Sequence, residues 1–547
     1  MNKSLIVCLV ACAFAASTSC KDIGRGGTGE MVVPEKDLRE IRSIQSSDIG
    51  LVKVPATTLP STRATTTPVT EIPLTLADVR QRALANNLDI QVELISPAIS
   101  RESLNAEEAR YETLFTTQAD YGSNDAPQTN AVEQQISGTQ SQSFRVTPGI
   151  TQPLRTGGEI DVNVPMSYSD VEGSSANTIN PLYTSDAAIS IRQPLLRGGG
   201  IDVNAQGIRI AFYGYQQAQA RTKLEIIRVL AEADRVYWRL YQAREALRVR
   251  RQEFDLAVVQ LERARRTVRA GAAAEVEIVR AQSGVADRVE AIINAENLQR
   301  DVERILKRIL NSPDLDIQSA TTIIPATPPQ PVYFELDIPH LIAQSMGQRM
   351  ELLETELQIS LETANVRVAR HETLPLLSIA YTYNINGLGD GWDESFEMVG
   401  NNDFADHRAG MQIEVPIGNE AARSRLRRAM LNRLQALATR QQRELQIRQE
   451  VLNTADQLSA NWQRILAARQ RVLLAQRLLE VEIRQFEQGL RTSTEVLNAQ
   501  TNLASAQLSE VSAITDYQIA QIDIAFATGT VLGASNVDWQ PVSAPKP

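Results

Sequence analysis

The sequence predicts a mainly helical protein with a β-barrel part, built from one unit of helix, strands and long helical hairpin that occurs twice. The first observation is an internal match between residues 271–282 and residues 489–500, 218 positions later and without a gap. The second is that each copy lies between two long stretches of helical periodicity. The third is that alternating, strand-like segments precede the long helix in both halves.

The two matched segments predict tight helix–helix turns. Gly271 and Gly489 fit the left-handed position that commonly ends a helix. In the second copy, Thr492 and Glu495 have the spacing of a capping box that starts the next helix. The first copy has Ala274 at the capping position, so we expect its second helix to start without that cap.

The composition excludes several classes of function. The chain has 547 residues and a formal net charge of −10, which argues against a nucleic-acid-binding surface. The three histidines, His340, His371 and His407, are scattered without the spacing of a zinc site. No phosphate-binding loop is present either. We therefore predict no catalytic activity, no metal and no cofactor.

The N-terminal residues predict export and lipid attachment. Residues 1–20 contain a short apolar run that resembles a signal peptide and is too short to span a bilayer. The run ends in Ser-Thr-Ser-Cys, which resembles the lipobox of bacterial lipoproteins and makes Cys20 the expected acylated residue. Cys12 is the alternative lipid site, and a plain leader with an incidental cysteine is the other reading. Residues 21–70, rich in Thr and Pro, are expected to form a tether.

Residues 71–320 form the first predicted repeat. Helical patterning covers about 74–110, and period-two segments follow up to Pro194. Among them, a Thr-Gly-Gly turn at 156–158 predicts a β-hairpin over about 143–169. A long helix with a seven-residue apolar repeat then covers about 208–270, and a second helix ends near Leu310.

The second predicted repeat covers residues 336–533, after a linker at 321–335 and before a tail at 534–547. Its strand and helix markers match those of the first repeat, and its long helix covers about 421–488. The hairpin at 143–169 accounts for much of the extra length of the first repeat. The sequence leaves open whether this hairpin joins the barrel.

The number of strands predicts an oligomer. Two to four strands in each half are too few to close a barrel, because even small barrels use about eight. The sequence has no run of 18 apolar residues, and open strand edges are not tolerated in a bilayer. We therefore expect several chains to share one barrel and one tube of helices.

This duplicated plan resembles the TolC-like outer-membrane efflux protein family over about residues 71–533. The segments that carry the resemblance are 74–77 with 83–87, the strand end at 193–196, and the paired turns at Gly271 and Gly489. The resemblance implies a homotrimer in which a 12-stranded barrel in the outer membrane continues into a helical barrel in the periplasm. It also implies that a periplasmic adaptor docks at the helical tips and that an inner-membrane RND or ABC pump supplies the energy.

The resemblance further implies a pore constriction near the turns. Glu495 would contribute an acidic ring, with Asn498 where a second acidic residue is often found, and Arg491 would help to latch the closed tip. The alternatives are that Glu495 only caps its helix and that Arg491 is simply solvated. The remaining candidates are the first-repeat equivalents of the gate and the residues of the turns expected to contact the adaptor: Glu277, Arg280, Gly271, Gly489 and Leu490.

A different class of protein remains as an alternative, a lipid-anchored coiled-coil scaffold or adhesin of the cell envelope. Such a rod needs no paired strands at matching places in both halves. Within the exporter interpretation, the sequence does not separate drug or metal efflux from type I protein secretion. Trp238 and Trp462 are expected to pack in the core or an interface, whereas Trp392, placed in a loop, is expected at the barrel mouth.

Overall fold

The computed structural model describes residues 71–129, 136–172, 179–271, 274–535 and 537. The chain divides into two units, and all of these residues belong to the second, Val69–Pro547. The predicted signal peptide, the predicted tether, Cys12 and Cys20 lie outside the described residues, as does most of the predicted tail.

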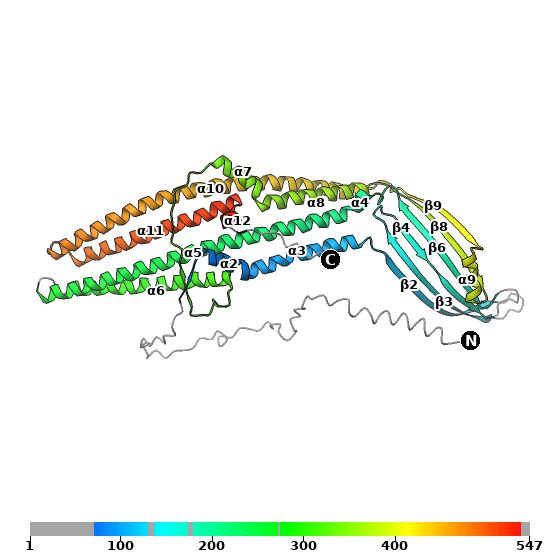
Figure 1. Ribbon diagram of the computed structural model, residues 1–547, viewed down its shortest axis with the longest axis horizontal. Helices are drawn as coiled ribbons and strands as arrows, with labels where there is room; N and C mark the ends of the chain where they lie inside the picture. The colour runs from blue at the N-terminus through cyan, green and yellow to red at the C-terminus, as the bar shows by residue number, and fades with distance from the viewer. Residues whose placement is uncertain (1–70, 130–135, 173–178, 272–273, 536, 538–547) are drawn as a thin grey trace. The chain divides into compact units, whose positions relative to one another are not determined.

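The first repeat has the predicted order of helix, strands and long helical hairpin (Figure 1). Its elements are β1 (Glu71–Leu74), α2 (Leu76–Asn86), α3 (Leu88–Ala109), β2 (Leu114–Thr129), β3 (Ile136–Pro153), β4 (Glu159–Asn163), β5 (Met166–Val171), β6 (Leu182–Pro194), α4 (Ile201–Asn204), α5 (Gln206–Arg269) and α6 (Val276–Leu310). The expected single helix over 74–110 is two helices, because Asn87 adopts an extended backbone and caps α3 with its side chain.

The second repeat follows the same order. Its elements are β7 (Thr322–Pro325), α7 (Ile338–Gln348), α8 (Met350–Glu372), β8 (Leu376–Gly389), α9 (Trp392–Asn401), β9 (Ala405–Glu414), α10 (Glu420–Glu487), α11 (Ser493–Thr528) and α12 (Val531–Ala534). The duplication is therefore confirmed. The predicted linker at 321–335 includes β7, which pairs in parallel with β1 of the first repeat. Trp392 does not lie in a loop as expected, because it is the first residue of α9.

One antiparallel sheet contains strands from both repeats, in the order β2-β3-β4-β6-β8-β9. β5 occupies the same position as β4, because both pair with β3 on one side and with β6 on the other. The hairpin formed around the Thr-Gly-Gly turn is therefore part of the sheet, between β2 and β6. The outer edges of β2 and β9 have no partner among the described strands.

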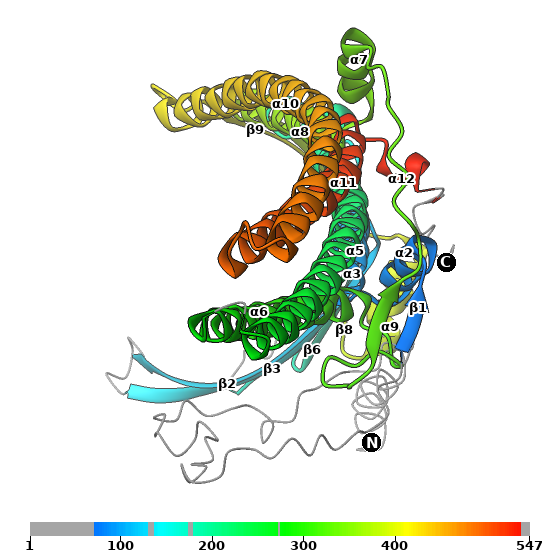
Figure 2. The ribbon, with the colours of Figure 1, turned by 90° about the vertical axis from the view of Figure 1, so that its left-hand side faces the viewer.

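The helices lie side by side, with each of the two long ones flanked by two shorter ones (Figure 2). α5 contacts α3 and α6 of its own repeat, and α10 contacts α8 and α11. Contacts of α5 with α8 and α11 join the two repeats. Among the described residues, none of the helices combines the length and the apolar character that crossing a bilayer requires.

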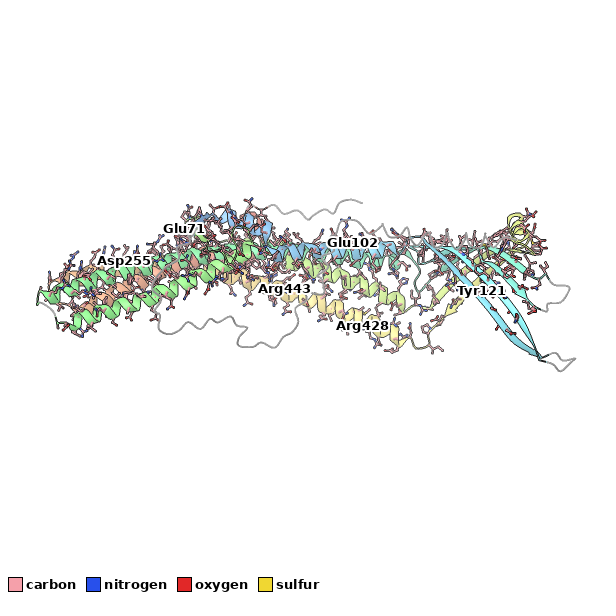
Figure 3. The ribbon with its side chains drawn as sticks, turned by 90° about the horizontal axis from the view of Figure 1, so that it is seen from below. Glu71, Glu102, Tyr121, Asp255, Arg428 and Arg443 are labelled. Atoms are coloured by element: carbon pink, nitrogen blue, oxygen red, sulfur yellow. The ribbon has the colours of Figure 1, made fainter. Side chains whose placement is uncertain are left out.

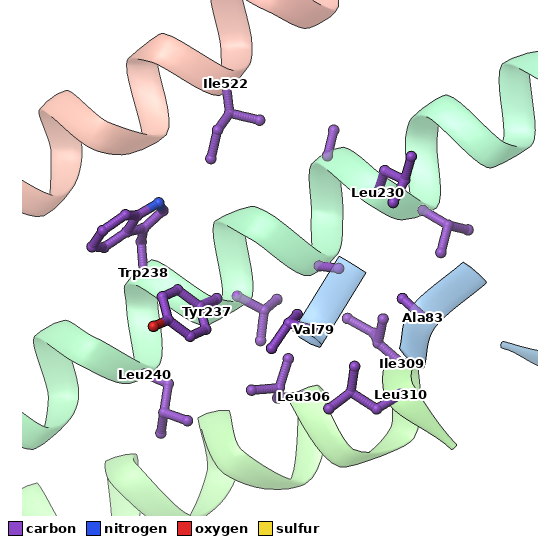
Figure 4. Close-up of a cluster of buried hydrophobic side chains, with 14 of the residues drawn as sticks. Val79, Ala83, Leu230, Tyr237, Trp238, Leu240, Leu306, Ile309, Leu310 and Ile522 are labelled. Atoms are coloured by element: carbon purple, nitrogen blue, oxygen red, sulfur yellow. The ribbon is translucent and has the colours of Figure 1, made fainter. Parts of the chain in front are cut away.

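The main hydrophobic core gathers where α2, α5 and α6 meet the end of α11 (Figure 4). Leu230, Tyr237 and Leu306 are fully buried there, and Trp238 packs edge-on against Tyr237 with ring centroids 5.4 Å apart. Trp462 packs against Tyr517 in a second cluster. The expected packing role of both tryptophans is thus confirmed. Burial of these apolar side chains away from water is the main contribution to the stability of the packed helices.

Candidate gate at the helical tips

Both helical hairpins end in a glycine turn of the predicted kind. Gly271 follows α5 with φ = 71°, and Gly489 follows α10 with φ = 75°. Around Gly489, its N–H donates to Phe486 O at 3.0 Å and Leu490 N–H donates to Gln485 O at 2.9 Å, which is a Schellman motif. A Cβ at either glycine would meet no heavy atom within 4 Å. The left-handed backbone, rather than lack of space, therefore favours glycine.

The two turns restart their helices differently, as the sequence predicts. Thr492 and Glu495 form a capping box at the start of α11, in which Thr492 N–H donates to Glu495 Oε2 at 2.8 Å. α6 starts after Glu275 with no side-chain cap. The second tip is thus the more firmly specified of the two.

The length of α5 separates the tips from the sheet. Its 64 residues start shortly after β6 and end at the first turn. At 1.5 Å per residue, α5 spans roughly 96 Å. Figure 3 labels Asp255 in the tip half of this helix and Tyr121 on β2. The candidate gate residues therefore belong to the end of the unit that lies far from the strands.

Arg491 joins three polar side chains of its own hairpin. Its Nη1 lies 2.8 Å from Glu495 Oε1, and its Nε donates to Gln485 Oε1 at 3.0 Å. Its Nε also lies 3.6 Å from Glu482 Oε2. The contacts of Arg491 that the structure describes thus stay within α10, the turn and α11. They restrain the shape of one tip.

Two groups close to the Glu495 carboxyl favour its ionised form. The Thr492 N–H and the Arg491 guanidinium lower the pKa of the Glu495 carboxyl below its ordinary value. The carboxyl is thus a helix cap and a surface charge at the same time. Asn498 is exposed one turn further along α11, so that it lies on the same side of the helix as Glu495.

Glu277 links the two hairpins. Its Oε2 accepts a hydrogen bond from Ser493 N–H of the second repeat at 3.2 Å, and its Oε1 accepts one from Arg280 Nη1 at 2.6 Å. Ser493 is buried, and Gln260 Nε2 of α5 donates to its Oγ at 3.3 Å. A carboxylate at the start of α11 is also favoured by the helix dipole. The first-repeat candidates therefore act on the second tip.

Arg288 is the principal residue here that sequence reasoning missed. It lies on α6, and its side chain is only 8% exposed. Its Nη2 donates to Thr501 Oγ1 at 2.8 Å and to Leu497 O at 3.3 Å on α11, and its Nε lies 3.5 Å from Glu253 Oε1 on α5.

A signal for this buried charge was present in the internal match. At the 218-residue offset Arg288 corresponds to Ala506, which is fully buried in the second repeat. An arginine in the first repeat at a position where the second repeat has alanine suggests that the arginine makes a polar contact specific to the first repeat. Arg288 therefore joins the first hairpin to the second, about three turns further along α6 than Glu277.

Comparison with known proteins places these features in a family. Residues 341–530 match the family model described as "Outer membrane efflux protein". The chain is also 22% identical over 318 residues to the outer membrane efflux protein BepC of Brucella suis biovar 1 (strain 1330), which covers 57% of this chain and 66% of BepC. Over these residues the chain is similar to the TolC-like outer membrane efflux proteins. The predicted resemblance is thus confirmed.

A second curated relative agrees with this similarity. TolC of Salmonella enteritidis is 22% identical to this chain over 205 residues, 36% of this chain and 42% of TolC. The aligned segments therefore span less than two thirds of the length of these two curated relatives.

Solved structures share the fold. The CmeC outer membrane channel of Campylobacter jejuni superimposes with a TM-score of 0.62 at 15% identity, over 83% of this chain and 85% of CmeC. VceC of Vibrio cholerae gives a TM-score of 0.61 at 13% identity, over 83% of this chain and 96% of VceC. At such identities the likeness shows the fold, which is the predicted combination of helical and β-barrel parts.

Proposed function

We propose that this efflux protein is the outer-membrane channel subunit of a tripartite export system. The observation that carries the proposal is the pairing, in one chain, of an open-edged antiparallel sheet with two long helical hairpins whose tips are linked. A sheet of this kind needs further copies to close, and the hairpins extend the closed wall into a tube. Substrates would enter at the tips and leave through the sheet end.

The proposed assembly is a homotrimer. Among the strands that the structure describes, none pairs with the outer edges of β2 and β9, which leaves them available to neighbouring copies. An open edge in a bilayer is unfavourable. Helices α6 and α10 also leave large apolar side chains uncovered, which another helix would bury. Among those with more than half of their surface exposed are Leu431, Leu434, Leu445, Leu473, Leu474, Ile293 and Leu298.

The tips are the proposed docking site of a periplasmic adaptor. Leu490 is 72% exposed at the second turn, and Val276 and Val279 are exposed just after the first. Together with the turns at Gly271 and Gly489 they offer apolar contacts next to fixed charges. The adaptor would connect the channel to an inner-membrane RND or ABC pump that provides the energy.

The same tips form the proposed gate. In a trimer Glu495 would present three carboxylates around one axis, with Asn498 beside them. Arg491 would hold the second hairpin in its closed shape through Glu482 and Glu495. Glu277 and Arg280 would hold the first hairpin against it.

Lipid attachment at Cys20 is a separate part of the proposal and places the mature chain at the outer membrane. It is supported by the sequence of the leader and of the tether after it. Mass spectrometry of the purified protein is expected to find a diacylglyceryl group on an N-terminal Cys20. A mature chain that starts at any other residue would refute this anchor.

The channel proposal is tested by purification and reconstitution. Light scattering of the protein in detergent is expected to give the mass of three chains, and planar bilayers are expected to show discrete conductance steps. A lipid-anchored scaffold or adhesin would also be elongated and helical, but it would give no conductance. A well-folded monomer without channel activity would therefore end this proposal.

A gene-deletion experiment in whole cells identifies the class of substrate that is exported. Deletion of the gene is expected either to increase retention of a small fluorescent dye or to abolish appearance of a polypeptide in the medium. The first outcome supports efflux and the second supports type I secretion. If the parent cells are shown to produce the protein and its deletion causes neither effect, an export role is contradicted.

A further inference from the structure

We infer that the membrane barrel of this channel has 18 strand positions rather than the 12 that the family resemblance implies. Seven strands form the sheet and two of them share one position, which leaves six positions per chain. Three copies would then contribute 18. The inference rests on the proposed trimer, and it gives the channel a wider exit.

The hairpin β3–β4/β5 is built into the sheet on both sides. β3 pairs with β2 along all 16 residues of β2, from Leu114 to Thr129. β4 and β5 pair with β3 on one side and with β6 on the other. Removing these strands from the wall would separate β2 from β6. The hairpin is thus a continuous part of the wall and not an appendage on it.

The apolar residues of the added strands lie on the same face of the sheet as those of the neighbouring strands. Paired residues form one row, with an apolar or aromatic side chain at each of its first five positions. The row runs Phe115, Ile150, Val162, Ile189, Tyr383 and His407. Phe115, Ile150, Val162 and Ile189 are exposed in the single chain. An exposed apolar row is what a lipid-facing surface requires.

The opposite face is polar from β3 to β9. The next row along starts at Leu114 on β2 and continues through Thr151, Asp161, Ser190, Thr382 and Arg408. Thr151 Oγ1 donates to Asp161 Oδ1 at 2.6 Å, and the hydroxyl oxygens of Ser190 and Thr382 lie 3.0 Å apart. Polar side chains therefore continue from the added strands into β6, β8 and β9. This face suits a water-filled lumen.

A third row is aromatic on four strands before it reaches Gly389 of β8. Tyr121, Phe144, Tyr168 and Tyr183 are paired in sequence across β2, β3, β5 and β6. The rings of Tyr168 and Tyr183 are 5.2 Å apart, and Trp392 of α9 lies 5.1 Å beyond Tyr183. Membrane barrels have such aromatic girdles where the wall meets the interface. Phe144 and Tyr168, both from the added strands, continue the girdle.

The free edges allow a second copy to close the wall. Six antiparallel positions make β2 and β9 run in opposite directions, so that β9 of one copy meets β2 of the next in antiparallel orientation. Phe115 on β2 is 66% exposed, and Met411 and Ile413 on β9 are 67% and 61% exposed. Pairing in trans would continue the apolar face around the barrel.

The consequence is the width of the exit. Barrel diameter grows roughly linearly with strand number, so 18 strands give about 1.5 times the diameter and roughly twice the cross-section of 12. Barrels of 16 to 18 strands leave an aqueous channel in porins. Cargo that passes the tips would therefore meet no narrower point in the barrel wall, and the tips alone would set the size limit.

Electron cryo-microscopy of the full-length protein in lipid nanodiscs tests the inference directly. We expect a trimer with 18 strands in the barrel wall. A trimer with 12 strands and the hairpin folded outside would overturn the inference but leave the proposed function intact. Particles that are not trimeric would instead overturn the proposed function on which the inference rests.

Cysteine labelling in membranes is an independent measurement. Residues 21–547 have no natural cysteine, so a single introduced cysteine is the one labelled there. Ile150→Cys and Val162→Cys are expected to resist a water-soluble maleimide until detergent is added, whereas Thr151→Cys and Asp161→Cys react through the lumen. Ile189→Cys and Ser190→Cys on β6 are the matched control pair. Equal labelling of both faces of the hairpin, with the β6 pair still distinct, would contradict its place in the wall.

Discussion

Replacement of Arg288 by alanine is expected to raise the conductance of the closed channel several-fold. The guanidinium is buried between α5, α6 and α11, where it contacts Glu253, Leu497 and Thr501. Removing one partner of a buried ion pair typically costs about 3–5 kcal/mol, because the remaining charge stays desolvated. Arg250 also contacts Glu253, at 2.9 Å, and would recover part of that loss. The ion pair with Glu253 lies within the first hairpin, whereas the hydrogen bonds to Leu497 and Thr501 join α6 to α11 of the second hairpin. The substitution removes both, so the tips of the two hairpins should separate more easily.

Single-channel recording checks this expectation, with Arg265→Ala as the matched control. Arg265 also forms an ion pair on α5, at 2.7 Å from Glu262, but both side chains are largely exposed. Exposed pairs contribute about 1 kcal/mol or less, so this variant should conduct as the unaltered channel does. Arg288→Lys retains the charge without the forked geometry and should be intermediate. If Arg288→Ala forms trimers whose closed state conducts no more than the control, Arg288 does not restrain the tips.

Replacement of Glu495 by glutamine is expected to reduce the preference of the channel for cations by several-fold. Three carboxylates around a narrow axis attract cations and repel anions, whereas three amides do neither. Glutamine also serves in a capping box, so the start of α11 should remain intact. The variant therefore removes the charge while it largely keeps the shape.

Reversal potentials under a salt gradient measure the selectivity. Glu510→Gln is the control, because Glu510 lies on the same helix, pairs with Arg469 and is distant from the turn. If the Glu495→Gln variant keeps the selectivity of the unaltered channel, Glu495 acts only as a helix cap and not in the gate. Arg491→Ala, which frees Glu482 and Glu495, should mainly raise the closed-state conductance.

The pH dependence of selectivity follows from the lowered pKa of Glu495. Thr492 N–H and Arg491 stabilise the carboxylate in the folded tip. The charge, and the stability it contributes, is therefore complete above the ordinary pKa of a glutamate and is lost only as the pH falls through the lowered value. Selectivity in the unaltered channel should thus persist from neutral pH into mildly acidic solution.

Several local features of this fold could be predicted from short segments of sequence. The left-handed turns at Gly271 and Gly489 and the capping box from Thr492 to Glu495 each depend on a few neighbouring residues. The helix after Ala274 was expected to start without a capping box, and α6, which starts at Val276, has no side-chain cap. Local backbone chemistry is strong enough to specify such features before any packing is known.

Contacts between distant segments could not be predicted in this way. Glu277 matches Glu495 in the repeat, yet it binds Ser493 of the other hairpin, because the two tips lie against each other. Arg288 is separated by more than 200 residues from its partners on α11. Trp392 was placed in a loop, whereas α9 starts there and brings its ring to Tyr183.

The duplicated plan, the lengths of the long helices, the chemistry of both turns and the alternating faces of the strands can all be predicted from the residues alone. These properties depend on neighbouring residues or repeat with the local periods of helix and strand, so they can be recognised along the chain. That the hairpin after β2 joins the sheet, and that Arg288 and Glu277 bind the second tip, became clear from the three-dimensional packing. Strand neighbours and buried charge partners depend on contacts across hundreds of residues, for which the alternation of side chains gives a face but not a partner.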